Sequence, residues 1–215
     1  MSMKKYFFSL FVCFLISTMT LASDENGIFP YHHARDEHAV AKLLADNYSD
    51  VISNSVFDPD NKTDQTRMAY AKNRVNDFGD EKAKELYTVL VFRKDNKTVG
   101  YVKYAVISRW IFPGGPIKGR IEQLAVDPAY RGQKFGEQLC QKALDEFAQK
   151  NLRFAEVLTT WEDVGEKFYC KKLGFEFYDQ ISTFPVKTST TYFWRKYLQP
   201  RMAWSTLIIK CMLRK

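Results

Sequence analysis

The chain has 215 residues, and its 32 Lys and Arg residues against 25 Asp and Glu residues give a formal net charge of +7. With 46% hydrophobic and 27% charged residues, it has the composition of a globular protein large enough to bury its own core. The basic excess does not indicate nucleic-acid binding, because the sequence has neither an arginine-rich run nor an alternation of aromatic and basic residues. The histidines and cysteines lack metal-ligand spacing, so no metal is expected.

The first 22 residues carry the features of an export signal. Lys4 and Lys5 precede an almost wholly apolar run from Tyr6 to Leu21. The segment Thr20-Leu21-Ala22 then offers small residues for cleavage. The run is short for a bilayer span, which needs about 20 residues. We therefore expect a signal peptide over 1–22 and an exported domain (periplasmic, secreted or lumenal), with an uncleaved N-terminal membrane anchor as the alternative.

Short apolar runs separated by turn residues predict strands and helices in mixed order along the rest of the chain. Asp36 is a candidate cap for a first helix, and Gly174 is a candidate left-handed cap for the helix that begins at Asp163. The stretch from Asn54 to Asp80 is the least regular part. Strands are expected over residues 28–35, 85–93, 99–109, 121–126, 154–160, 175–184 and 191–197.

The stretch from Ile121 to Leu144 organises the chain. Its first six residues are apolar enough for a buried strand, and Asp127-Pro128 ends that strand because proline cannot donate to a ladder. From Phe135 onward, apolar residues recur at helical spacing. The unit is a strand, a basic glycine-containing turn and a helix, and the free N–H groups and helix dipole at such a turn favour a phosphate.

This unit resembles the acyl-CoA signature of the GNAT N-acetyltransferase superfamily, Arg/Gln-x-x-Gly-x-Gly/Ala. Arg131 matches its first position and Gly136 its last, while Lys134 occupies the fourth position, where glycine is usual. The segment from Phe168 to Phe175 is similar to the family's Tyr-x-x-Leu-Gly-Phe segment. The resemblance implies an α/β fold for a domain over residues 28–198, with a mixed, mostly antiparallel central sheet and helices on both faces.

By resemblance, the domain binds acetyl-CoA as a co-substrate through two stretches. The backbone of Leu124, Ala125 and Val126 would run beside the pantetheine arm, and its N–H groups would polarise the thioester carbonyl. The Lys134 side chain would either collide with the pyrophosphate or add its charge to the N–H donors. The turn that would hold the pyrophosphate consists of Arg131, Gly132, Gln133, Lys134, Phe135 and Gly136.

Direct acetyl transfer to an amine also needs a base, for which Glu122 is the candidate. It lies on the strand before the turn, four residues ahead of Val126, so regular alternation would place both side chains on one face of the sheet. The alternative is a solvent-exposed or ion-paired carboxylate without a catalytic role.

The acid that protonates the departing thiolate is harder to assign. In the family, a tyrosine four residues before the Gly-Phe pair usually has this role, but here that position is Cys170, and Tyr169 comes one residue earlier. One residue is about 100° around a helix, so only one of the two side chains can point at the sulfur. A local helix bulge could return Tyr169 to the site, Cys170 could be the acid, or water could serve. We favour Tyr169, with a core aromatic as the alternative.

The acceptor and further partners are less defined. In the family, the region after the first strand shapes the acceptor pocket, so the acids of residues 54–80 either form a rim that favours a cationic amine or lie on a solvated helical face. The tail over 199–215 is basic and amphipathic, which indicates either weak membrane contact or a helix packed on the domain. The oligomeric state is not defined by the sequence.

Two functions from different classes follow from these features. The first is an exported N-acetyltransferase that moves an acetyl group from acetyl-CoA to a primary amine of a small molecule or protein. The second is an exported GNAT-like domain without catalysis that binds a ligand or a partner. Acetyl-CoA is expected to be scarce outside the cytoplasm, so an enzyme would need delivery into another compartment or host cell, or a different acyl donor.

Overall fold

The computed structural model describes residues 25–47, 64–107, 118–159, 164–182 and 190–198. The predicted signal peptide over 1–22 and the predicted tail over 199–215 lie outside these ranges. No helix within the ranges is both long and apolar enough to cross a bilayer.

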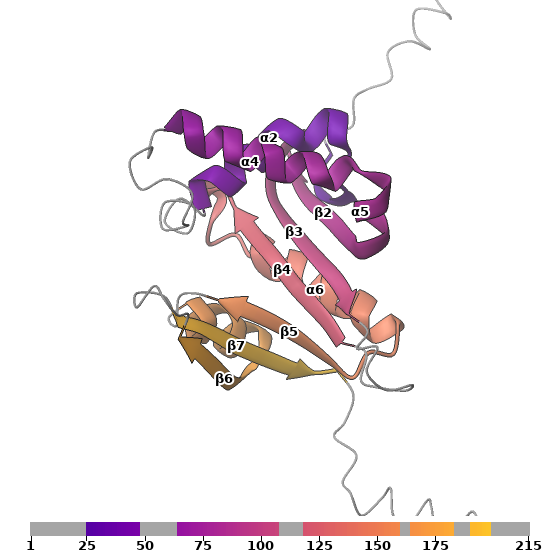
Figure 1. Ribbon diagram of the computed structural model, residues 1–215, viewed down its shortest axis with the longest axis vertical. Coiled ribbons are helices and arrows are strands. Elements are labelled where there is room, and N and C mark those ends of the chain that lie inside the picture. Colours follow the sequence, from indigo (N-terminus) through magenta and orange to yellow (C-terminus); the bar gives the residue numbers. More distant parts are fainter. Residues whose placement is uncertain (1–24, 48–63, 108–117, 160–163, 183–189, 199–215) are drawn as a thin grey trace, which may run out of the picture.

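The described residues form one seven-stranded sheet with the strand order β1-β2-β3-β4-β5-β7-β6 (Figure 1). Neighbouring strands are antiparallel except for β4 and β5, which are parallel. A tight turn with Asp95 and Asn96 at positive φ connects β2 to β3. The strands are β1 (Gly27–Pro30), β2 (Tyr87–Lys94), β3 (Lys97–Ile107), β4 (Lys118–Val126), β5 (Phe154–Thr159), β6 (Glu176–Ser182) and β7 (Thr190–Tyr197).

Helices cover both faces of the sheet, and each face has its own buried core (Figure 1). On one face, α2 (His33–Asn47) packs on β3 and β4 and on α4 (Asp64–Gly79), which short α5 (Glu81–Leu86) follows. On the other face, α6 (Phe135–Gln149) packs on β3 and β4 and on short α8 (Lys171–Leu173). A π-helical turn, η2 (Gly165–Cys170), precedes α8, and a 3₁₀ turn, η1 (Pro128–Tyr130), follows β4. The predicted α/β fold, with a mostly antiparallel sheet and helices on both faces, is confirmed.

The first helix begins earlier than predicted. It starts at His33, so Asp36 lies in its first turn and is fully buried instead of capping the helix from outside. The Asp36 carboxylate accepts hydrogen bonds from the His32 N–H (2.8 Å) and the Thr98 hydroxyl (2.7 Å) and pairs with Arg93 (2.8 Å). Burial alone would raise the pKa of Asp36, but these bonds hold it below its ordinary value.

Helix α4 lies within the stretch that the sequence predicted to be least regular. Its helical pattern is weak because few of its residues are apolar, and these form one narrow buried row. Asp77 and Asp80 are exposed, which agrees with a solvated helical face, whereas Asp58 and Asp60 lie outside the described residues. The apolar row of α4 consists of Met68, Ala71, Val75 and Phe78.

Candidate active site

The parallel strands β4 and β5 pair over a short distance only. Their register ends where Ile121 lies opposite Val157, whereas β4 continues to Val126 and β5 to Thr159. Beyond Ile121 the two strands diverge, as Figure 1 shows. Within the described sheet, the β5-facing edge of β4 therefore has backbone groups beyond this point with no strand partner, and these groups can bind a ligand.

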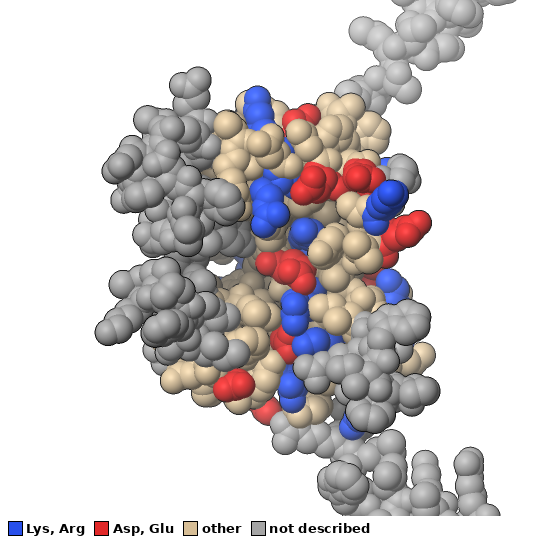
Figure 2. Space-filling model, viewed as in Figure 1, with Lys and Arg blue, Asp and Glu red and all other residues tan. Residues whose placement is uncertain are grey.

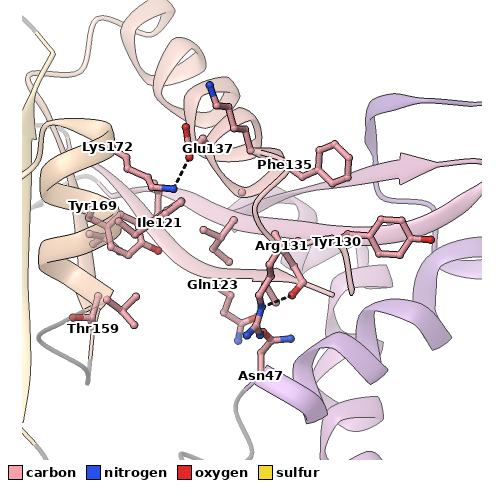
Figure 3. Close-up of a pocket in the computed structure, with 18 of the residues that line it drawn as sticks. Asn47, Ile121, Gln123, Tyr130, Arg131, Phe135, Glu137, Thr159, Tyr169 and Lys172 are labelled. Atoms are coloured by element: carbon pink, nitrogen blue, oxygen red, sulfur yellow. Dashed lines mark hydrogen bonds and ion pairs between the residues drawn. The ribbon is translucent and has the colours of Figure 1, made fainter. Parts of the chain in front are cut away.

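A pocket of about 690 Å³ lies at this divergence. It is bounded by β4, the turn into α6, the end of α2, the end of β5 and the π-helical turn (Figure 3). Eight of the nine predicted cofactor-binding residues line it, and Gln133, which is exposed, does not. Glu122 and Tyr169 also line the pocket, whereas Cys170 does not.

The turn into α6 has the backbone conformation that a glycine-rich signature requires. Gly132 has a φ of +82°, and a β-carbon there would meet no atom within 4 Å. Lys134 has a φ of +64°, in the left-handed region that costs a non-glycine residue about 1–2 kcal/mol. This conformation explains why glycine is usual at the position of Lys134. The lysine side chain is exposed, and the first N–H groups of α6 lack partners within the helix.

Arg131 connects this turn to the end of α2. Its Nη2 donates a hydrogen bond to Oδ1 of Asn47 at 2.6 Å, and its Nε donates to the Val126 carbonyl at 3.4 Å. Asn47 is the last residue of α2, and its Nδ2 donates to the Leu43 carbonyl at 2.8 Å. Figure 3 shows Arg131 and Asn47 meeting at one side of the pocket. Asn47 is a pocket residue that sequence reasoning missed, because only the fold brings the end of α2 to the signature turn.

A second pair of charged residues lies at the rim of the pocket. Lys172 of α8 donates to Oε1 of Glu137, in the first turn of α6, at 2.9 Å (Figure 3). A carboxylate in the first turn suits the helix dipole but would repel a phosphate at the same helix end. The Lys172 ammonium balances that charge. Sequence reasoning missed both residues, although Glu137 directly follows the signature and Lys172 lies within the second family segment.

Glu122 occupies a β-bulge in β4. Lys103 of β3 lies opposite Gln123, and the next β3 residue lies opposite Ile121, so Glu122 is the additional residue. A bulge shifts the alternation of side chains along a strand. The prediction that Glu122 and Val126 share one face of the sheet is therefore wrong.

The contacts on each side of the bulge show the two faces. Val126 packs on the core beneath α6. Gly119 also faces α6, since a β-carbon there would collide with Phe147, and its neighbour Arg120 therefore points to the opposite face. Glu122 forms an ion pair with Arg120, with 3.9 Å between Oε1 and Nη1. It is a partly exposed, ion-paired carboxylate that lines the pocket where β4 and β5 separate.

The helix after β5 contains the bulge that would move the tyrosine by one position. Its π-helical turn covers Gly165–Cys170, and a π turn accommodates one additional residue. As a result Tyr169 lines the pocket and Cys170 does not. Gly174 ends this helix in the left-handed conformation (φ +70°), as its sequence position predicts. Of the three alternatives for the acid, this geometry agrees with the return of Tyr169 to the site.

Tyr169 is a core residue as well as a pocket residue. Its exposed fraction is 6%, and its ring makes edge-to-face contacts with Phe168 and Phe175, at centroid distances of 5.0 and 5.7 Å. The Phe175 N–H donates to the Tyr169 carbonyl at 3.0 Å. These contacts fix the ring at the wall of the pocket, so the two interpretations of this residue are compatible.

A buried carboxylate joins the strands next to the point of divergence. Glu156 of β5 is 2% exposed and accepts hydrogen bonds from Lys118 (2.7 Å), Arg120 (2.8 Å) and the Tyr178 hydroxyl (2.6 Å). Burial acts to raise the pKa of Glu156, but these bonds hold it below its ordinary value. Burial and the neighbouring carboxylate raise the pKa of Tyr178 to about 12. Sequence reasoning placed Glu156 on a strand without recognising the cluster.

Comparison with known proteins agrees with this geometry. Residues 38–175 match the model of the acetyltransferase (GNAT) family. No curated protein matches the chain. Among solved structures, a GNAT-family protein from Desulfovibrio desulfuricans superposes with a TM-score of 0.59 at 15% identity, covering 81% of this chain and all of the other.

Two further solved structures contain the expected co-substrate or its product. The Salmonella typhimurium protein yncA with its cofactor acetyl-CoA has a TM-score of 0.54 at 18% identity and covers 82% of this chain and 95% of its own. PaiA N-acetyltransferase from Thermoplasma acidophilum in complex with coenzyme A has a TM-score of 0.58 at 16% identity, with coverages of 80% and 99%. At these identities the superpositions establish the fold.

The chain belongs to the GNAT acetyltransferase family, since the family match spans more than half of its residues. The family assignment and the fold confirm the corresponding predictions from the sequence, including that of an acetyltransferase. The predicted co-substrate agrees with the acetyl-CoA and CoA complexes of the structural neighbours.

Proposed function

We propose that this chain transfers an acetyl group from acetyl-CoA directly to a primary amine of a small molecule or protein. The observation that carries the proposal is the pocket at the divergence of β4 and β5, which has a helix N-terminus at one end and the Glu122 carboxylate at the other. The π-helical turn adds a phenol to the same pocket, through Tyr169. A base, an acid and a phosphate-binding turn are the groups that acetyl transfer requires.

The residues present fit acetyl-CoA. The turn from Arg131 to Gly136 has an open position at Gly132, where even a β-carbon would meet nothing, and it leads into the N-terminus of a 15-residue helix. The stretch of β4 beyond its register with β5, Leu124 to Val126, supplies backbone groups for the pantetheine arm and the thioester carbonyl. Lys134 adds positive charge at the rim, and Lys172 offsets the charge of Glu137 there. When bound, acetyl-CoA supplies an acetyl group activated as a thioester.

The chain's own residues would move two protons. Glu122 takes the proton of the acceptor ammonium, directly or through one water, so that the neutral amine can attack the thioester carbonyl. Tyr169 gives its phenolic proton to the departing sulfur. The attacking nitrogen loses its second proton as the amide forms, and this proton restores the Tyr169 phenol through solvent. The proton on Glu122 is then lost to solvent, so that one proton is released in each turnover. Glu122 lies on the face of the sheet away from α6, so the amine approaches from the side opposite the phosphate-binding turn.

Export forms a second part of the proposal. Lys4, Lys5 and the apolar run from Tyr6 to Leu21 support a cleaved signal peptide and an exported domain, which is either released or, without cleavage, anchored by this segment. N-terminal sequencing of the protein from its native host should begin near Ser23 or Asp24. An intact Met1 on the mature protein would contradict cleavage.

Calorimetric titration of residues 23–215 with acetyl-CoA tests the enzyme proposal. We expect saturable binding, weakened by about 1–3 kcal/mol in Arg131→Ala, the scale of a hydrogen bond to a charged group. Lys150→Ala, an exposed basic residue at the far end of α6, is the control and should leave binding unchanged. A domain that binds no acetyl-CoA would favour the alternative, a GNAT-like binding or interaction module.

A further inference from the structure

The face of the sheet on which Glu122 lies carries a group of basic side chains next to the pocket. Arg120 and Lys118 of β4 point to the face away from α6, and Lys103 of β3 lies on the same face, beneath α4. Figure 2 shows Lys and Arg side chains running down this face between acidic ones. Arg74 of α4 and Arg195 of β7, which lies opposite Glu156, join these three cations, and the carboxylates beside them include Asp77, Glu122 and Glu156.

Two of these carboxylates, Glu156 and Glu122, offer little to a second cation, and the third, Asp77, is exposed to solvent. Glu156 is buried and already bound by Lys118, Arg120 and Tyr178. Glu122 is the base proposed for the amine itself, and it is paired with Arg120. An acceptor with several positive charges would therefore meet an excess of positive charge on the described part of this face.

Of these cations, Lys103 has a charge that is little offset by nearby carboxylates. Its Nζ lies 3.8 Å from the ring centroid of Tyr87 and 5.0 Å from that of Phe78, and the residue is half-buried. Within the described part of the chain, no ion pair joins it to a carboxylate; Glu122 and Asp77 attract it only at longer range. Burial lowers the pKa of Lys103, and Arg74 lowers it further. A partly desolvated ammonium held on two aromatic faces gains from an anion that reaches it.

We propose that the acceptor is a primary amine that also carries an anionic group, with the amine at Glu122 and the anion at Lys103. The inference rests on the proposed acetyl transfer and adds the class of acceptor. Lys103 lies opposite the bulge that holds Glu122, one strand away, so a short molecule can reach both side chains. Simple members of this class are amino acids with a carboxylate a few bonds from the amine.

Bisubstrate analogues test the inference without knowledge of the natural acceptor. In each analogue, the amine is joined to the CoA sulfur through a –CH₂–CO– unit, so that CoA provides affinity and the acceptor portion enters its own subsite. The acceptor portions are glycine, β-alanine and 4-aminobutyrate, each paired with its neutral amide. We expect calorimetry to give at least one carboxylate a roughly 10- to 100-fold lower Kd than its amide, the scale of a charged hydrogen bond.

Two variants assign the preference to Lys103. Lys103→Met keeps most of the side-chain length and should bring the carboxylate and amide analogues to equal affinity. Lys97→Met, at the exposed start of the same strand, should keep the preference. If Lys103→Met does not fold, the comparison of carboxylate and amide affinities in the wild-type protein decides alone whether the acceptor carries an anionic group.

The outcomes separate this inference from the function on which it rests. If all six analogues and CoA bind but no carboxylate is preferred, or if the preference survives in Lys103→Met, the acceptor class is wrong and acetyl transfer stands. If neither CoA nor any analogue binds, the proposed function fails and the inference fails with it.

Discussion

The Cα of Gly165, the first residue of the π-helical turn, lies against the indole ring of Trp194 on β7. A β-carbon at Gly165 would come within 2.2 Å of the Trp194 ring, where no side chain fits. The contact fixes the start of the turn four residues before Tyr169. Trp194 in turn donates from Nε1 to the hydroxyl of Thr159, another pocket residue, at 3.3 Å.

Gly165→Ala should therefore destabilise the fold by about 1–3 kcal/mol, the usual cost of overpacking a core. It should also lower kcat, because the turn that carries Tyr169 must move away from β7. Urea denaturation and steady-state kinetics measure the two effects. Gly136→Ala is the matched control for stability, since its β-carbon would make ordinary contacts at 3.4 Å or more. Wild-type stability in Gly165→Ala would contradict the contact.

Tyr169→Phe should lower the turnover number by roughly 10²–10⁴-fold, the range for loss of a general acid. Acetyl-CoA binding should remain, because the ring still packs between Phe168 and Phe175. Turnover is measured as CoA release at saturating acetyl-CoA. Cys170→Ala is the control, and full turnover is expected since Cys170 does not line the pocket. The reverse pattern, with activity lost in the cysteine variant alone, would assign the acid to Cys170.

Lys134→Gly should stabilise the protein by about 1 kcal/mol, because glycine removes the cost of the left-handed conformation at this position. Thermal or urea denaturation measures the change. Gln133→Gly, one residue earlier in the same exposed turn, should not stabilise the protein, since the φ of Gln133 is not in the left-handed range. Acetyl-CoA affinity gives a second result: weaker binding in Lys134→Gly would mean that the ammonium contributes to the phosphate site, and tighter binding that the lysine obstructs it.

Glu156→Gln should cost about 3 kcal/mol at neutral pH, since breaking a buried ion pair leaves charge uncompensated. A carboxyl whose pKa is lower in the folded than in the unfolded chain stabilises the fold above its ordinary value, 4.5 for Glu156. That contribution disappears as the pH falls through the lower folded-state value. The variant should therefore lose less stability than the wild type between about pH 5 and pH 3. Urea denaturation across this range measures the free energy of unfolding of both proteins. Equal losses of stability in the variant and the wild type between about pH 5 and pH 3 would contradict the prediction.

The sequence predicts the pocket wall on the α6 side better than the rest of the site. The turn and the helix after β4 can be predicted from short stretches of sequence. Their signals are Asp127-Pro128, Gly132 and the apolar repeat from Phe135, and each affects only the backbone close to it in the chain. The one-residue shift before Gly174 is likewise a local signal, and a helix bulge was one of the three alternatives that it left open. The one departure from the signature, Lys134, keeps the left-handed backbone for which glycine is the usual residue.

Features that depend on neighbouring strands or distant elements were missed or misjudged. The bulge at Glu122 arises from its pairing with β3, and nothing in the alternation along β4 reveals it. Asn47, Lys172 and Glu156 reach their partners only after the sheet has formed. Helix α4 has too few apolar residues for a clear helical period.

The short parallel register between β4 and β5 has a mechanical consequence. Of the described strands, β1 to β4 form one antiparallel plate, and β5, β7 and β6 form another. Backbone pairing holds the plates together over four residues of β4, next to the carboxylate of Glu156, which bonds to side chains of both plates. The width of the gap at the pocket therefore depends on the angle at which the two plates meet along this seam. Substitutions at the seam positions that do not line the pocket, such as Ala155, should therefore alter catalysis without contacting either substrate.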